Sequence, residues 1–241
     1  MLVTGADPLR CSKLRSALLH RYTFEGTGRT ARDSYGTADG TAIGAELFGT
    51  GTLRFDPTEA AQYVELPAGI IAGLQDTTFE VWLSVASTRQ WARVFDFGHP
   101  NTDRATRRSY LFLTVQGSTQ GRPRAVYLSS DRNASEVVVN ASRSLQPGAL
   151  THFAVVFDSA QHKLRLFING QPDGEATVAG SLAAVDATNN WLGRSQFSSD
   201  PYLDGTLHEF RIYSTALTAD QISASFNAGS DPQYLANQST M

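Results

Sequence analysis

The chain has 241 residues, 41% of them hydrophobic, and a formal net charge of -3. This length suits one β-sandwich or barrel whose core is large enough to be stable without disulfides or metal ions. The single cysteine, Cys11, excludes a disulfide within the chain. The slightly acidic balance, with no clustered basic stretch, argues against nucleic-acid binding. The amino terminus lacks the apolar run of a signal peptide, and no stretch is long enough to insert into a membrane.

Short runs of alternating apolar and polar residues recur along the chain, each bounded by Gly, Asp, Asn or Pro, as half-buried strands require. The predicted strands, in chain order, are Leu18–Phe24, Thr52–Phe55, Tyr63–Leu66, Thr78–Val85, Arg93–Phe97, Tyr110–Val115, Ala125–Leu128, Val137–Asn140, Thr151–Phe157, Leu164–Ile168, Thr177–Ala179, Asn190–Leu192 and Gly205–Tyr213. Helical pattern appears only at Gly69–Leu74 and at Thr218–Asn227, with Thr218 as N-cap and Gly229 as stop signal. We interpret both helical segments as connectors.

Two of these strands indicate which faces are buried. In one, Phe79, Val81, Leu83 and Val85 alternate with polar residues and with Trp82, so one face is predicted to lie in the core. The run from Thr151 to Asp158 is continuously apolar, as a strand covered on both faces would be. Many short strands with turns between them predict an all-β chain, an antiparallel β-sandwich with two sheets of six to seven strands. Asn169-Gly170 is a strong signal for a hairpin turn.

The stretch Asn189–Ala216 reads NNWLGRSQFSSDPYLDGTLHEFRIYSTA, a strand, a loop and a second strand. It resembles the closing hairpin of the laminin-G-like family, within the concanavalin A-like lectin/glucanase superfamily. Matching segments extend over Leu18–Phe226, among them GTLRFDPTEAAQYVELP, TFEVWLSVAS, QWARVFDFG, SYLFLTVQG and GALTHFAVVFDSAQHKLRLFINGQPDG. The resemblance implies a concanavalin A-like jelly roll over residues 18–228, with an N-terminal extension at 1–17 and a tail at 229–241.

Bacterial members of this family are often attached to secreted glycosidases that process arabinose or galactose. The resemblance therefore implies a non-catalytic, lectin-like module that is extracellular and accessory to polysaccharide or glycoside processing. Its expected partners are an arabinose- or galactose-containing glycan and an attached or separate glycosidase. We expect no nucleic-acid partner and no membrane insertion.

The resemblance also implies a structural Ca²⁺ between the first loop and the end strands. The loop Glu25–Gly40 carries Glu25, Asp33 and Asp39 among glycines, and carboxylates and freed carbonyls are what this hard cation prefers. The same residue types also make turns without any metal. Relatives usually carry an acidic residue in the closing strand where this chain has His208, and this departure weakens the calcium prediction.

Sugar sites combine an aromatic ring, which packs on the C–H face of the sugar, with polar side chains that bind its hydroxyls in fixed directions. Rim loops of a sandwich are the natural place for them. The predicted ligand-binding residues are Trp91, Arg93, Asp96, Asp131, Arg132, Asn133, Arg194, Gln196 and Tyr202. Two structural alternatives remain open: Arg194 and Asp200 can tie the closing hairpin together, and Asp96 can accept an internal hydrogen bond from an arginine.

The catalytic pattern of sandwich glucanases is absent from the sequence. Those enzymes alternate three carboxylates along one strand as Glu-x-Asp-x-x-Glu, whereas the acidic residues here are scattered among loops. The five histidines have no metal-ligand spacing, and we expect His152 to be packed and hydrogen-bonded in a core strand. Two alternatives to the binding module stay open: a protein-interaction or adhesion domain, and an enzyme that uses this scaffold without the glucanase carboxylates.

Overall fold

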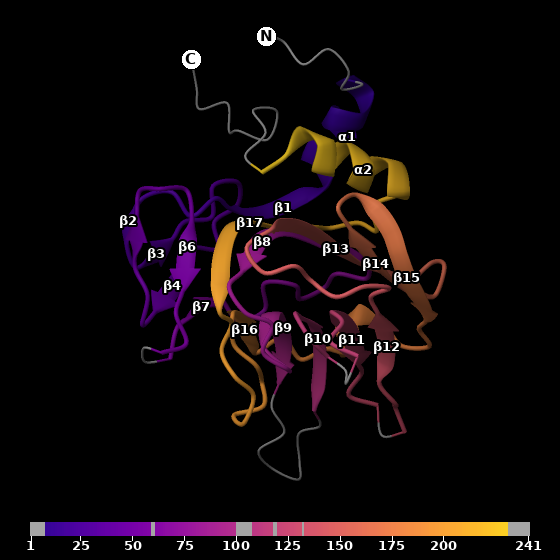
Figure 1. Ribbon diagram of the computed structural model, residues 1–241. Coiled ribbons are helices and arrows are strands. Elements are labelled where there is room, and N and C mark those ends of the chain that lie inside the picture. The colour runs from indigo at the N-terminus through magenta and orange to yellow at the C-terminus, as the bar shows by residue number, and fades with distance from the viewer. Residues whose placement is uncertain (1–7, 59–60, 100–107, 118–119, 132, 231–241) are drawn as a thin grey trace.

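The computed structural model describes residues 8–58, 61–99, 108–117, 120–131 and 133–230, and it is an antiparallel two-sheet sandwich with two helices on one outer face (Figure 1). The elements in chain order are α1 (Pro8–Ala17), β1 (Leu18–Tyr22), β2 (Thr27–Gly28), β3 (Thr30–Ala31), β4 (Gly40–Ile43), β5 (Leu47–Phe48), β6 (Leu53–Phe55), β7 (Tyr63–Leu66), β8 (Thr77–Val85), β9 (Arg93–His99), β10 (Ser109–Thr114), β11 (Arg124–Leu128), β12 (Val137–Asn140), β13 (Leu150–Asp158), β14 (Lys163–Ile168), β15 (Gln171–Thr177), the 3₁₀ turn Leu182–Ala184, β16 (Asn189–Leu192), β17 (Gly205–Tyr213) and α2 (Ala219–Ala228). No helix among the described residues is long and apolar enough to span a membrane.

The first sheet has the strand order β1-β17-β8-β13-β14-β15, and β6 also pairs with β17. We call it the helix-covered sheet, because α1 and α2 lie against its outer face (Figure 1). The second sheet has the order β12-β11-β10-β9-β16-β7-β4-β3. We call it the loop-covered sheet, because the loop Arg194–Asp204 folds over its outer face. A separate two-stranded ribbon, β2 with β5, stands at one side of the molecule (Figure 1).

The main core lies between the two sheets and is built from inward-facing strand residues. Phe79 of β8 stacks on Phe95 of β9 with ring centroids 4.8 Å apart, and both rings meet Phe210 of β17. The predicted core face of Phe79, Val81, Leu83 and Val85 is confirmed, since all four belong to this cluster. Offset and edge-on ring pairs of this kind add stabilisation beyond the burial of their area.

The strand β13 is covered on both faces, as its continuous apolar run predicts. Phe153, Val155 and Phe157 enter the main core. Ala154 and Val156 belong to a second cluster. Its other members include Leu14 and Ala17 of α1, Leu217 just before α2, and Ile222 of α2. The prediction that Thr218–Asn227 is only a connector is therefore wrong, because α2 buries Ile222 against the helix-covered sheet.

The ends of α2 follow its sequence signals. The Thr218 side chain accepts from the N–H of Gln221, and the Gln221 side chain accepts from the N–H of Thr218, which forms a capping box. Gly229 ends the helix with φ 81°. The turn between β14 and β15 is also confirmed, since Asn169 and Gly170 have φ 51° and 74°, the two positive values that a type I′ turn requires.

Other expectations were wrong at the edges of the fold. Residues 69–74 form hydrogen-bonded turns and no helix. Of the predicted strand Thr177–Ala179, only Thr177 is in a strand, as the last residue of β15, which begins at Gln171. The helix α1 and the short strands β2, β3, β4 and β5 were not predicted, because none of them carries a periodic apolar pattern long enough to detect. The two main sheets accordingly contain seven and eight strands instead of six to seven.

Candidate functional site

The outer face of the loop-covered sheet gathers chemically distinctive side chains in one row. Register pairs Glu65 of β7 with Trp191 of β16, Trp191 with Asp96 of β9, and Asp96 with Phe112 of β10. Their neighbours along each strand, such as Phe95, enter the main core, so alternation places the row on the opposite face. Sequence segments more than a hundred residues apart thus share one surface.

The loop Arg194–Asp204 closes over the middle of this row. It returns to the sheet where the N–H of Leu203 donates to the carbonyl of Gly193 at 3.0 Å. The ring of Phe197 packs edge-on against Tyr110, 5.8 Å between centroids, and joins a small apolar cluster with Phe112. The loop therefore shields part of the outer face that a two-layer sandwich would otherwise expose.

Arg93 and Asp96 lie beneath this loop as a buried ion pair. The Nε of Arg93 donates to Oδ2 of Asp96 at 3.1 Å, and Nη2 lies 3.1 Å from Oδ2 of Asp200 in the loop. The guanidinium also stacks on the ring of Phe112, 3.8 Å from its centroid, and its Nη1 donates to the carbonyl of Trp91. Arg93 therefore joins the sheet to the loop, and its charge is already balanced by two carboxylates.

The carboxyl of Asp96 has an unusual protonation equilibrium. Burial raises the pKa of Asp96 to about 6, against the opposing effects of the Arg93 guanidinium and of the hydrogen bond from the N–H of Gln196. Its Oδ1 has no hydrogen-bond partner among the described residues. The structural alternative for Asp96, an internal hydrogen bond from an arginine, is the arrangement present.

Beside this pair lies a second group, which we call the aromatic–arginine surface: Tyr63, Trp191, Arg194 and Tyr202. The Arg194 guanidinium lies 4.0 Å from the ring centroid of Trp191 and 4.7 Å from that of Tyr63. Tyr202 stacks on Tyr63 at 6.2 Å. Trp191 and Tyr63 are largely buried by this packing, whereas Arg194 and Tyr202 are partly exposed.

The structure brings six of the nine predicted ligand-binding residues to this face or its edge. Trp91 lies at the edge with φ 68°, and Arg93, Asp96, Arg194, Gln196 and Tyr202 lie on the face or in its covering loop.

The other three predicted residues belong to the connection between β11 and β12. The side chain of Asp131 accepts from the hydroxyl of Ser129, its carbonyl accepts from the N–H of Ala134, and Asn133 is exposed. Arg132 lies outside the described residues. Sequence reasoning missed Tyr63, Glu65, Phe112, Trp191 and Phe197, although strand alternation around Trp191 and Tyr63 was a signal that could have found the row.

The residues expected to hold calcium do not fit that ion as they are arranged. Oδ1 of Asp33 accepts from the N–H groups of Arg21, Tyr35 and Gly36, and Oδ2 accepts from Ala38 and contacts Nδ1 of His20 at 2.7 Å.

These five partners use the lone pairs of Asp33 that a metal would need. Asp39 accepts from the N–H of Asp33, and Glu25 is exposed. Among the described residues no group of three or more His, Cys, Asp or Glu side chains is placed to hold a metal ion. Calcium binding stays a prediction that this geometry does not favour.

A buried ionic network occupies the outer face of the helix-covered sheet. Glu80 accepts from Tyr213 and Ser225 at 2.8 and 2.7 Å, contacts Nε2 of His152 at 3.2 Å, and pairs with Arg211. The packed, hydrogen-bonded state expected for His152 is confirmed.

This network is closed to ligands, because Glu80 and Arg211 are fully buried and Ser225 belongs to α2. His208, partly exposed, lies on β17 of the same sheet, and burial lowers the pKa of its imidazole. His208 and Asp96 are therefore on different sheets, and the structure does not bring them together as an acid–base pair.

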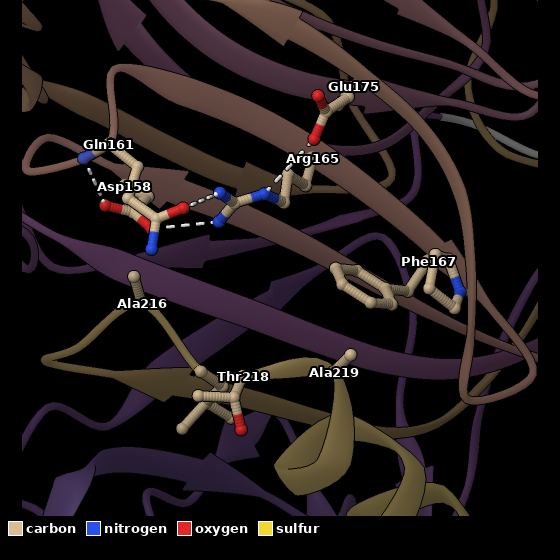
Figure 2. Close-up of a pocket in the computed structure, with 10 residues that line it drawn as sticks. Asp158, Gln161, Arg165, Phe167, Glu175, Ala216, Thr218 and Ala219 are labelled. Carbon is tan, nitrogen blue, oxygen red and sulfur yellow. Dashed lines mark hydrogen bonds and ion pairs between the residues drawn. The ribbon is translucent and has the colours of Figure 1, made fainter.

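A cavity of about 360 Å³ lies between β14, β15 and the start of α2 (Figure 2). Its apolar side is formed by Phe167, Leu217 and small residues, and Figure 2 shows Arg165 on the opposite side directed at Asp158, Gln161 and Glu175. Arg165 pairs with Asp158 at 2.8 Å and with Glu175 at 3.4 Å. The charges of this cavity are therefore satisfied within the protein, and no predicted site residue lines it.

Comparison with solved structures finds the same fold in carbohydrate-related proteins. The chain matches part of Trypanosoma rangeli sialidase with TM-score 0.66 at 16% identity. The match covers 88% of this chain and 33% of that one, so the chain spans about a third of the sialidase. Domain 4 of AbnA, an extracellular arabinanase from Geobacillus stearothermophilus solved with arabinotriose, matches with TM-score 0.59 at 18% identity, covering 86% and 96%.

A third structural match is the CBM40 of a Ruminococcus gnavus sialidase bound to sialyllactose, with TM-score 0.51 at 14% identity, covering 64% of this chain and 83% of that one. Comparison with curated protein sequences finds no match. The family model Laminin_G_3, described as concanavalin A-like lectin/glucanases superfamily, matches residues 58–223. This match covers most of the sandwich, and the chain belongs to that family.

Proposed function

We propose that this domain binds carbohydrate without transforming it, and that the aromatic–arginine surface of the loop-covered sheet is where it does so. The observation that carries the proposal is Arg194. This residue is partly exposed, its guanidinium lies 4.0 Å from the ring centroid of Trp191 and 4.7 Å from that of Tyr63, and it has no hydrogen-bond or ion-pair partner within the described chain. An aromatic platform joined to directed donors is the combination that sugar sites use.

A carboxylate beside this surface completes the set of polar groups that a sugar needs. Glu65 is exposed, and its Oε1 lies 3.5 Å from Nε1 of Trp191. Its other lone pairs are available to accept from sugar hydroxyls, while Arg194 donates to ring or hydroxyl oxygens. Tyr202, stacked on Tyr63, presents a partly exposed ring at the same place.

The arrangement of the acidic residues supports a binding role over a catalytic one. Two carboxylates of this face, Asp96 and Asp200, both pair with Arg93. Glycoside hydrolysis needs two carboxyl groups on opposite sides of the scissile bond, one of them free to protonate the leaving oxygen. Asp96 has a raised pKa, but it is fully buried beneath the loop and is not accessible to a sugar.

We further propose that the domain is extracellular and accessory to a glycosidase, attached or separate, whose substrate contains arabinose or galactose. The structural match to a domain of an extracellular arabinanase solved with arabinotriose supports this assignment. Binding would concentrate the enzyme on its polymer through many weak contacts.

Calorimetric titration with arabino- and galacto-oligosaccharides tests the proposal. We expect binding that Arg194→Gln and Tyr202→Ala each weaken by about tenfold or more, since both side chains are partly exposed and their loss spares the core. Arg143→Gln is the matched control, because Arg143 is exposed in the loop after β12 and should leave the affinity unchanged. Full affinity in both surface variants, or no binding to any saccharide, would reject the proposal.

A further inference from the structure

The state of Arg194 differs from that of four other shielded arginines, Arg21, Arg93, Arg165 and Arg211. These four each pair with one or two carboxylates. Arg194 is held instead by two aromatic rings, at 4.0 and 4.7 Å, and its N–H groups have no acceptor within the described residues. Its guanidinium is thus packed beside two rings, while its hydrogen-bond donors remain unused within the described chain.

The nearby carboxylate does not fill this role. Glu65 is directly opposite Trp191 in the register of β7 and β16, and its Oε1 lies 3.5 Å from the Trp191 indole nitrogen. It forms no ion pair with Arg194. Glu65 also makes the surface selective, because it repels an anion that is not seated against the guanidinium.

The chemistry of the guanidinium indicates what would fill the vacant edge. Its N–H groups form a planar pair matched to the two oxygens of a carboxylate, and contact with two aromatic rings restricts the side chain before a ligand arrives. A neutral hydroxyl uses one donor at a time and leaves the charge uncompensated, whereas a carboxylate compensates the charge and accepts both bonds.

We infer that the aromatic–arginine surface recognises a glycan that carries a carboxylate, as a uronate or sialate unit does, with Arg194 as the group that binds it. This inference rests on the proposed function and adds the substrate class. Tyr202 would pack against the C–H face of the acidic sugar while Arg194 holds its carboxylate. Charge pairing also requires affinity to fall as salt is added.

The test compares acidic oligosaccharides ending in galacturonate, glucuronate or sialate with their methyl esters, which keep the shape and remove the charge. We expect at least one acid to bind about ten- to a hundredfold more tightly than its ester, with the preference lost in Arg194→Gln. Arg194→Lys should restore part of the preference, because it keeps the charge and loses the planar pair of donors. Arg143→Gln should retain all of it.

The outcomes separate this inference from the function on which it rests. If esters or neutral arabino- and galacto-oligosaccharides bind as tightly as the acids, the acidic-sugar assignment is overturned while carbohydrate binding stands. If Arg194→Gln keeps the preference for acids, Arg194 is not the group that binds the carboxylate. If no saccharide binds, both the inference and the proposed function fail. Circular dichroism and thermal unfolding of each variant establish that its fold is intact.

Discussion

Replacing Asp33 with Asn tests the role of this carboxylate as the hub of the first loop. Burial acts to raise the pKa of Asp33, but hydrogen bonds from His20 and from the N–H groups of Arg21, Ala38 and Gly36 outweigh it and lower the pKa from 3.8 to about 2. A depression of that size corresponds to roughly 2 kcal/mol of folding stability at neutral pH. The Asn side chain keeps one acceptor oxygen and turns an NH₂ group toward backbone donors.

We therefore expect Asp33→Asn to lose about 3 kcal/mol of unfolding free energy at pH 7, the extra loss coming from backbone N–H groups left without an acceptor. The sign of the pH dependence follows from the lowered pKa. The contribution of Asp33 is complete above its unfolded pKa of 3.8 and is lost as the pH falls through about 2. The difference between wild type and variant should therefore shrink over that interval.

Urea unfolding followed by tryptophan fluorescence at a series of pH values measures both quantities. Asp39→Asn is the matched control. Asp39 is exposed, and its one acceptor bond within the described residues is from the N–H of Asp33, which Asn can keep through its oxygen. That variant should lose less than about 1 kcal/mol. A loss below about 1 kcal/mol in Asp33→Asn, or a difference that stays constant as the pH falls, would refute the assignment.

Three further predictions concern the metal, a turn and the buried network. Adding calcium should leave the melting temperature unchanged, because the carboxylate of Asp33 is saturated; a rise that Asp33→Asn abolishes would contradict this. Gly170→Ala should lower the free energy of unfolding by roughly 2 kcal/mol or more, since φ is +74° and the new Cβ would lie 2.8 Å from the Phe226 side chain. Gly148→Ala is the control, because its φ is +79° but the space around it is open. It should lose only about 1 kcal/mol in the same urea titration. Glu80→Gln should lose about 3–5 kcal/mol, because Arg211 then remains buried with less compensating charge. An unfolding midpoint equal to that of wild type would disprove the role of Glu80.

The sheets themselves were accessible from sequence because strand patterns are local. Alternation in Phe79–Val85 and the continuous apolar run of β13 need only neighbouring residues to be recognised. The signals at Asn169-Gly170 and at Thr218 are local as well, since each acts through backbone dihedrals or a hydrogen bond three residues away. The strands β2, β3 and β5 could not be found this way, because two residues hold no readable period. The strand β4 reads Gly-Thr-Ala-Ile, in which only Ile43 is a large apolar residue.

The candidate site could be predicted only in part, because its members meet through register. Residues such as Arg194 and Tyr202 were identified by type, yet their partners Trp191 and Tyr63 belong to strands that pair across more than a hundred positions of chain. Asp131 and Asn133 are of residue types that sugar sites often use, but they lie in the connection between β11 and β12.

The sequence by itself determined the fold class, the family, the hairpin turn and the ends of α2, since apolar periodicity and helix capping depend on residues close together in the chain. Only the tertiary structure decided which charges are free. Asp33, Asp96 and Arg93 look like ligand-binding groups in the sequence, but each is compensated by donors or acceptors from distant segments. Arg194 is the opposite case, because its guanidinium lies against two aromatic rings and no carboxylate in the described part of the chain pairs with it. Whether a charge is compensated depends on its neighbours in three dimensions, so the candidate site can be identified only from the tertiary structure.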